Sequence, residues 1–119
     1  MLGCCGAICD WAGRYEMYAD IIVFLDRQLA SLGNPRVIAG CPTCKKNLAK
    51  NEDSQVQGIW EILEEIGLPE KAKRLNKPIA VHDACGARGD AETQASIRRI
   101  AQSLGCQVTQ TPYEGDKSP

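Results

Sequence analysis

Apolar stripes at helical spacing alternate with short apolar runs along this chain, and no other feature constrains its fold as strongly. The first stripe predicts a helix of about five turns. Asp10 is its expected N-cap, and Gly33-Asn34-Pro35 is its expected stop. The stripe consists of Met17, Tyr18, Ile21, Ile22, Leu25, Leu29 and Leu32.

Two further stripes predict two more helices. One is expected to be capped near Asp53 or Ser54 and closed at Gly67. The other is expected to be capped by Asp90 and ended by Gly105, since glycine tolerates the left-handed conformation at a helix end. Their apolar positions are Val56, Ile59, Trp60, Leu63 and Ile66, followed by Ile97, Ile100, Ala101 and Leu104.

Three short runs are predicted to be strands, because they are apolar and too short for helices. They cover residues 37–39, 79–81 and 106–111. Strands that alternate with helices predict an α/β fold, which we expect to be a layered sandwich with a mainly parallel sheet flanked by helices. At 119 residues the chain fits a single domain, 1–119, with a polar tail at 113–119.

Four cysteines fall into two tight turns whose spacing is difficult to explain by packing. Cys4 and Cys5 are adjacent in Gly-Cys-Cys-Gly, and 35 residues separate Cys5 from Cys41, which begins Cys-Pro-Thr-Cys and precedes Cys44. Cys41 and Cys85 each follow a predicted strand, and such strand ends open on one edge of a parallel sheet. Thiolates are soft ligands that suit iron–sulfur clusters or zinc.

Each cysteine motif also has a competing interpretation. Cys4 and Cys5 are compatible with burial, because free cysteine is among the most buried residue types. Cys41 and Cys44 are compatible with a thioredoxin-like redox pair, because a C-x-x-C at a helix start has a lowered thiol pKa. The residues expected to pack in the core are Cys9, Cys106, Trp11 and Trp60.

His82 and Asp83 lie at the second strand end, just before Cys85. His82 is expected to be either a metal ligand or a donor that orients the loop. Asp83 is expected to brace the loop. The sequence contains no general acid–base pair and no Ser-His-Asp set, so we predict no catalytic residue.

Composition excludes several classes of function. A net charge of −1 and a pI near 5.8 give no basic surface, so nucleic acid is not an expected partner. The longest apolar run, 21–25, is far shorter than the ~20 residues that a membrane span needs. No secretory signal is visible, and seven cysteines are an odd number for closed disulfide pairing. We therefore expect a reducing, cytoplasmic setting.

The motifs resemble the cysteine-rich CCG domain of heterodisulfide reductase B subunits and of the iron–sulfur subunits of lactate, glycolate and glycerol-3-phosphate oxidoreductases. The resemblance implies a noncubane four-iron four-sulfur cluster, or zinc as in some members, with Cys4, Cys5, Cys41, Cys44 and Cys85 as metal ligands. It also implies a partner, namely a flavin-containing or other iron–sulfur subunit or domain of the same complex. The matching segments are Gly3-Cys4-Cys5-Gly6, Asp10-Trp11-Ala12-Gly13-Arg14, Cys41-Pro42-Thr43-Cys44 and His82-Asp83-Ala84-Cys85.

The order of the motifs differs from the family pattern. In the family, the cysteine after a His-Asp strand end precedes the vicinal pair and the C-x-x-C, whereas Cys85 comes last here. One explanation is that the chain is part of a longer protein, or a rearranged relative, that holds the back of one motif and the front of the next. Another is that Cys85 folds back to complete the site.

Three functions follow from these patterns. The first is an iron–sulfur electron-transfer domain of a heterodisulfide-reductase-like or 2-hydroxy-acid-oxidase-like oxidoreductase. The second is a structural zinc-binding domain, and the third is a metal-free scaffold fragment without activity of its own. We expect the chain to be a component of an oxidoreductase rather than an enzyme by itself.

Overall fold

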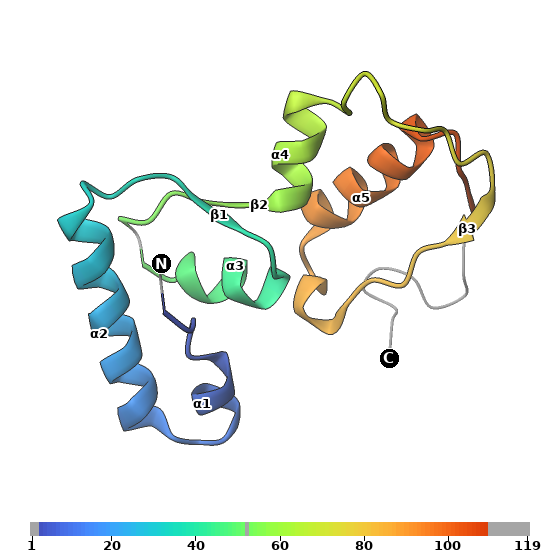
Figure 1. Ribbon diagram of the computed structural model, residues 1–119. Coiled ribbons are helices and arrows are strands. Elements are labelled where there is room, and N and C mark those ends of the chain that lie inside the picture. Colours follow the sequence, from blue (N-terminus) through green and yellow to red (C-terminus); the bar gives the residue numbers. More distant parts are fainter. Residues whose placement is uncertain (1–2, 52, 110–119) are drawn as a thin grey trace. The chain divides into compact units, whose positions relative to one another are not determined.

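A computed structural model describes residues 3–51 and 53–109 (Figure 1). Helices and strands alternate along it, so the prediction of an α/β chain is confirmed. The chain divides into two compact units, residues 1–57 and 58–119, which are described separately. The predicted polar tail at 113–119 lies outside the described residues.

The first unit contains the vicinal cysteines, the C-x-x-C motif and the longest helix. That helix, α2, has 17 residues, which confirms the prediction of about five turns. The elements of this unit are α1 (Ala7–Trp11), α2 (Tyr15–Ser31), β1 (Val37–Ala39), α3 (Pro42–Leu48) and β2 (Val56–Gly58).

Helix α2 ends where the sequence predicts and begins later than expected. Leu25 and Leu29 from its apolar stripe are buried. The chain leaves the helix through Gly33 and Asn34, whose φ angles of 78° and 51° are left-handed. Asp10 is not the N-cap, because it lies inside α1 and a turn at Gly13, with φ 68°, separates the two helices.

Strand β1 forms at 37–39 as predicted, with Val37 and Ala39 buried and Ile38 exposed. It pairs with β2 in a two-stranded sheet, and the Val37 N–H donates to the Gln55 carbonyl at 2.8 Å. The expectation that Val56 begins a helix is wrong, because Val56 lies in β2. The next helix starts at Ile59 after Gly58, so neither Asp53 nor Ser54 caps it.

The second unit is built on two helices that pack together and on a short parallel sheet. Strands β3 and β4 run parallel, with Ile79 opposite Val108. Residues 110–111 of the predicted last strand lie outside the described residues. The elements are α4 (Ile59–Ile66), β3 (Pro78–Ala80), the 3₁₀ helix η1 (Cys85–Ala87), α5 (Ala91–Ser103) and β4 (Gln107–Thr109).

Helix α5 begins and ends as predicted. The Asp90 carboxylate accepts a hydrogen bond from the Thr93 N–H at 3.1 Å, so it caps the helix. Gly105 follows the helix with a φ of 80°. Between α4 and α5, the buried Thr93 hydroxyl donates to the buried Glu61 carboxylate. A buried polar contact therefore joins the first turns of these two helices.

Asp83 braces the loop after β3, as expected. Its carboxylate is buried and accepts two hydrogen bonds from the Arg98 guanidinium, at 2.9 and 2.7 Å. This bidentate geometry is the stronger form of such a pair. It fixes the segment before Cys85 to α5.

Of the predictions for Cys106, Trp11 and the sheet, only that for Cys106 is confirmed. Cys106 is buried as predicted, whereas Trp11 is 73% exposed, so the prediction that it packs in the core is wrong. The strands of the described residues form two separate two-stranded sheets rather than one.

Among the described residues, no helix has both the length and the apolar character that crossing a membrane requires.

We predict that Asp83→Ala lowers the free energy of unfolding of the second unit by about 2–4 kcal/mol, because it leaves the largely buried Arg98 guanidinium without this carboxylate. Urea denaturation followed by circular dichroism measures the change. Glu70→Ala, at an exposed carboxylate, is the matched control and should stay within about 0.5 kcal/mol of the wild type. Equal stabilities of the two variants would contradict the bracing role of Asp83.

Candidate functional site

Cys5 and Cys44, far apart in the sequence, come together in the first unit. The Cys44 thiol donates to the Cys5 sulfur, and the two sulfur atoms are 3.0 Å apart. Cys5 lies in the turn before α1, whereas Cys44 lies in the first turn of α3. Both side chains are half-buried. The fold therefore joins the vicinal pair to the C-x-x-C motif, as the sequence predicts.

Cys41 occupies the N-cap position of α3. It has extended backbone, with φ −116° and ψ 128°, and Pro42 follows at the first helical position, where proline is well tolerated. The backbone N–H of Cys44 donates to the Cys41 sulfur and is the main cause that lowers the pKa of this thiol. The Thr43 N–H and the Cys44 thiol act in the same direction. Cys41 is exposed, so this stabilised thiolate faces solvent.

Cys44 has the opposite character. Burial, followed by the neighbouring sulfurs of Cys5 and Cys41, raises the pKa of its thiol to about 12. Crowded thiols oppose one another's ionisation because each thiolate repels the next. The Cys41 thiol therefore ionises at lower pH than the Cys44 thiol, which remains protonated near neutral pH.

Cys4 lies at the edge of the site. It is exposed, and its sulfur accepts a hydrogen bond from the Gly6 N–H at 3.5 Å. Gly6 is required in this turn, because its φ is 78° and a Cβ there would lie 2.9 Å from the Tyr18 ring. The glycine after the vicinal pair thus allows the cysteine turn to pack against α2.

Asn47 is a structural residue of the site that the sequence interpretation missed. Its side chain is buried, and its amide nitrogen donates to the Cys5 carbonyl at 3.2 Å. Because it lies one turn after Cys44 on α3, it fixes the backbone of the vicinal pair to that helix. The only sign of this role in the sequence is that a polar residue lies one turn after the C-x-x-C. Because polar residues are common on helix surfaces, this sign does not single out Asn47.

Three of the predicted ligands, Cys5, Cys41 and Cys44, line one cavity of about 390 Å³. The remaining walls are apolar side chains and backbone from the N-terminal turn, α2, β1 and α3. They are Gly3, Leu25, Val37, Ile38, Ala39, Gly40 and Leu48. The cavity thus combines soft sulfur donors with a dry lining, which is the environment of many thiolate-bound metal centres.

The thiols of this cavity are drawn together more closely than metal binding requires. Two thiolates on one tetrahedral zinc, with Zn–S bonds near 2.3 Å, lie about 3.8 Å apart. The Cys5 and Cys44 sulfurs are 3.0 Å apart. Within residues 3–51 and 53–109, no group of three or more His, Cys, Asp or Glu side chains is arranged to hold a metal ion. The donors suit iron or zinc in their chemistry, and binding would require these sulfurs to separate.

Cys85, the fifth predicted ligand, belongs to the second unit. It begins η1 and is exposed. His82 is also exposed, and it lies in the segment that joins β3 to η1.

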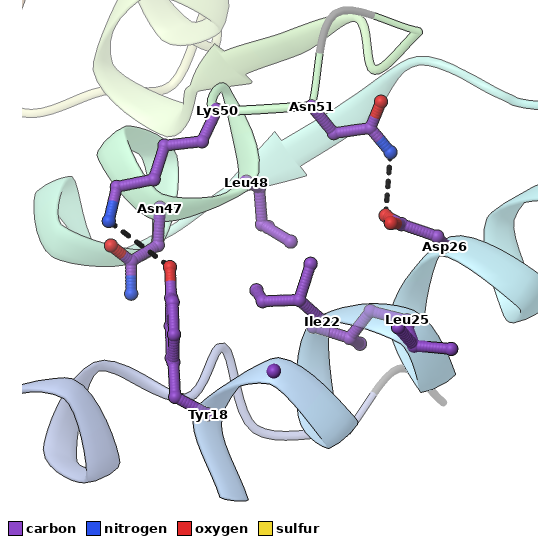
Figure 2. Close-up of a pocket in the computed structure, with 10 residues that line it drawn as sticks. Tyr18, Ile22, Leu25, Asp26, Asn47, Leu48, Lys50 and Asn51 are labelled. Carbon is purple, nitrogen blue, oxygen red and sulfur yellow. Dashed lines mark hydrogen bonds between the residues drawn. The ribbon is translucent and has the colours of Figure 1, made fainter. Parts of the chain in front are cut away.

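A larger cavity of about 560 Å³ lies beside the cysteine cavity and shares Leu25 and Leu48 with it. Figure 2 shows apolar side chains at its centre and polar groups at its ends. At one end the Lys50 ammonium donates to the Tyr18 hydroxyl at 3.1 Å. At the other, Asn51 donates to Asp26 at 2.6 Å. These contacts tie α2 to the segment after α3 and so support the helix that carries Cys44.

Comparison with protein-family models, with curated proteins and with solved structures finds no match for this chain. The likeness to the CCG domain remains a prediction that rests on the motifs themselves.

We predict that Cys41 is alkylated at lower pH than Cys44 in the metal-free chain. The pKa of Cys41 is lowered, so its thiolate forms first as pH rises, whereas the pKa of Cys44 is raised to about 12. Iodoacetamide labelling between pH 6 and 10, read by peptide mass spectrometry, measures both rates. Cys5→Ser should shift Cys44 labelling to lower pH. If the labelling rates of Cys41 and Cys44 rose over the same pH range, the prediction that the two thiols differ in pKa would be contradicted.

Proposed function

We propose that the first unit binds an iron–sulfur cluster and serves as an electron-transfer domain of a larger oxidoreductase, similar to the CCG domains. The observation that carries this proposal is the convergence of Cys5, Cys41 and Cys44 on one cavity, with Cys4 in the adjacent turn. Thiolates are the usual protein ligands of such clusters. A vicinal pair and a C-x-x-C that meet in this way are more specific than either motif alone.

The ligands would be Cys4, Cys5, Cys41 and Cys44, with a fifth from Cys85 or from residues outside this chain. When bound, the cluster would supply one-electron redox chemistry. The chain's own contribution is to position the thiolates and to supply hydrogen bonds. The N–H groups of Thr43 and Cys44 point at the Cys41 sulfur and that of Gly6 at the Cys4 sulfur. Such donors stabilise negative charge on ligand sulfurs and raise the reduction potential.

The remaining parts of the proposal follow from the same likeness. The electron donor or acceptor would be a flavin-containing or other iron–sulfur subunit or domain of the same complex, and the compartment would be the cytoplasm. The chain supplies no acid–base machinery for a substrate, so it would carry electrons rather than complete a reaction. A layered sandwich with a mainly parallel sheet remains a proposal that rests on the alternation of helices and strands along the sequence.

We predict that the chain, expressed and purified anaerobically, contains iron and acid-labile sulfide in matching amounts and absorbs visible light. Cys5→Ser, Cys41→Ser and Cys44→Ser should each remove most of the iron, because each deletes a donor from the cavity. Cys9→Ser is the matched control, since Cys9 is a half-buried cysteine on α1 that does not line the cavity. Iron content and visible spectra of all variants are the measurements.

The same measurement separates the alternatives. Loss of iron in Cys85→Ser would identify Cys85 as the fifth ligand. Zinc without iron, in a chain that chelators unfold, would replace the electron-transfer role with a structural one. A folded, colourless chain with neither metal would contradict the proposal.

A further inference from the structure

The Cys5, Cys41 and Cys44 thiols are arranged for a reaction that needs no metal. The Cys5 and Cys44 sulfurs are 3.0 Å apart, about 1 Å more than a disulfide bond of ~2.05 Å. Asn47 anchors the Cys5 backbone to the helix that carries Cys44, so the two sulfurs are held as neighbours by the fold. A small rotation of either side chain would bring them within bonding distance.

Of the three cysteines, Cys41 is the most accessible to reagents in solvent. Cys5 and Cys44 are half-buried, whereas Cys41 is exposed at the start of α3 and contacts the Cys44 thiol. Of these three thiols, Cys41 is therefore the one that a disulfide reagent from solvent reaches first. The three sulfurs form a path from the surface into the cavity, in the order Cys41, Cys44, Cys5.

We propose that the metal-free chain performs thiol–disulfide exchange with low-molecular-weight disulfides, with Cys41 as the attacking thiol and a Cys5–Cys44 disulfide as the end product. This activity goes beyond electron transfer by a cluster and does not depend on it. Its substrate class is a small, soluble disulfide, because Cys41 is exposed whereas Cys5 and Cys44 are half-buried and line the cavity.

The reaction balances over three exchange steps. The Cys41 thiolate attacks one sulfur of the reagent, forming a mixed disulfide and releasing the first thiolate. Cys44, after giving its proton to water, attacks the Cys41 sulfur and releases the second thiolate. Cys5, likewise deprotonated, attacks the Cys44 sulfur and returns Cys41 to its thiolate form. The protein loses two electrons and two protons in total, and the reagent becomes two thiols.

The last step is favoured by the surroundings of each sulfur. The departing Cys41 sulfur lies at the exposed start of α3, whereas the Cys5 and Cys44 sulfurs that it leaves behind are half-buried and in contact. The product disulfide lies in the cavity, where small reductants reach it less easily than they reach a Cys41–Cys44 bond at the surface. Because Cys5 and Cys44 are also proposed ligands, the oxidised chain would be unable to take up a metal centre until a thiol reduces it.

The test uses the full 119-residue chain, stripped of metal, reduced, and then mixed anaerobically with glutathione disulfide. Free thiols are blocked with N-ethylmaleimide at intervals, and peptide mass spectrometry identifies each linkage. The wild type should end in a Cys5–Cys44 disulfide. Cys41→Ser should slow its formation about tenfold or more, and Cys5→Ser should stop the reaction at Cys41–Cys44. Cys9→Ser, the matched control, should follow the wild-type course.

A wild type that ends in Cys41–Cys44 or in stable glutathione adducts would overturn the proposal. So would an unchanged rate in Cys41→Ser, or the same mixture of linkages in urea, where the fold no longer holds Cys5 beside Cys44. Circular dichroism of each reduced variant shows whether it has kept its fold. The assay contains no metal, so iron uptake and exchange can succeed or fail independently.

Discussion

The contact between the Cys5 and Cys44 sulfurs is the constraint on which the proposed site depends. It connects the N-terminal turn to α3, two segments separated by α1, α2 and β1. The contact exists because Gly6 lets the turn pack against Tyr18 and because Asn47 binds the Cys5 carbonyl. The chemistry of the site follows from this packing, since burial and sulfur neighbours keep Cys44 protonated while the start of α3 stabilises the Cys41 thiolate.

The same arrangement suits the two kinds of chemistry that we propose for this cavity. Sulfur donors in an apolar cavity can hold a redox metal centre, and thiols in contact can exchange disulfides. The two uses exclude each other, because a thiolate bound to metal is not free to attack a disulfide. Cys41 is exposed, and Cys5 and Cys44 are half-buried. In the proposed scheme, small disulfides would oxidise Cys5 and Cys44 and so block metal binding, and small thiols would reduce them and restore it.

The sequence predicted those features that depend on local chemistry. The stop of α2 at Gly33, the Asp90 cap and the burial of Cys106 follow from turn chemistry, capping and polarity, and all three are observed. Helix starts were harder to predict, because Asp10 is a good capping residue that falls inside α1 instead. Helix α3 carries too few apolar residues for a stripe, so periodicity alone does not predict it. The convergence of Cys5 with Cys44 was expected from their spacing, but the Asn47 bond needed tertiary structure.

The central claim is that the fold itself, without metal, holds Cys5 beside Cys44. The most direct measurement is a nuclear Overhauser spectrum of the reduced, metal-free chain with its cysteines isotopically labelled. The account predicts cross-peaks between the β-protons of Cys5 and those of Cys44, which disappear in urea. A well-dispersed spectrum that shows cross-peaks between Cys41 and Cys44 but none from Cys5 to either would contradict the account.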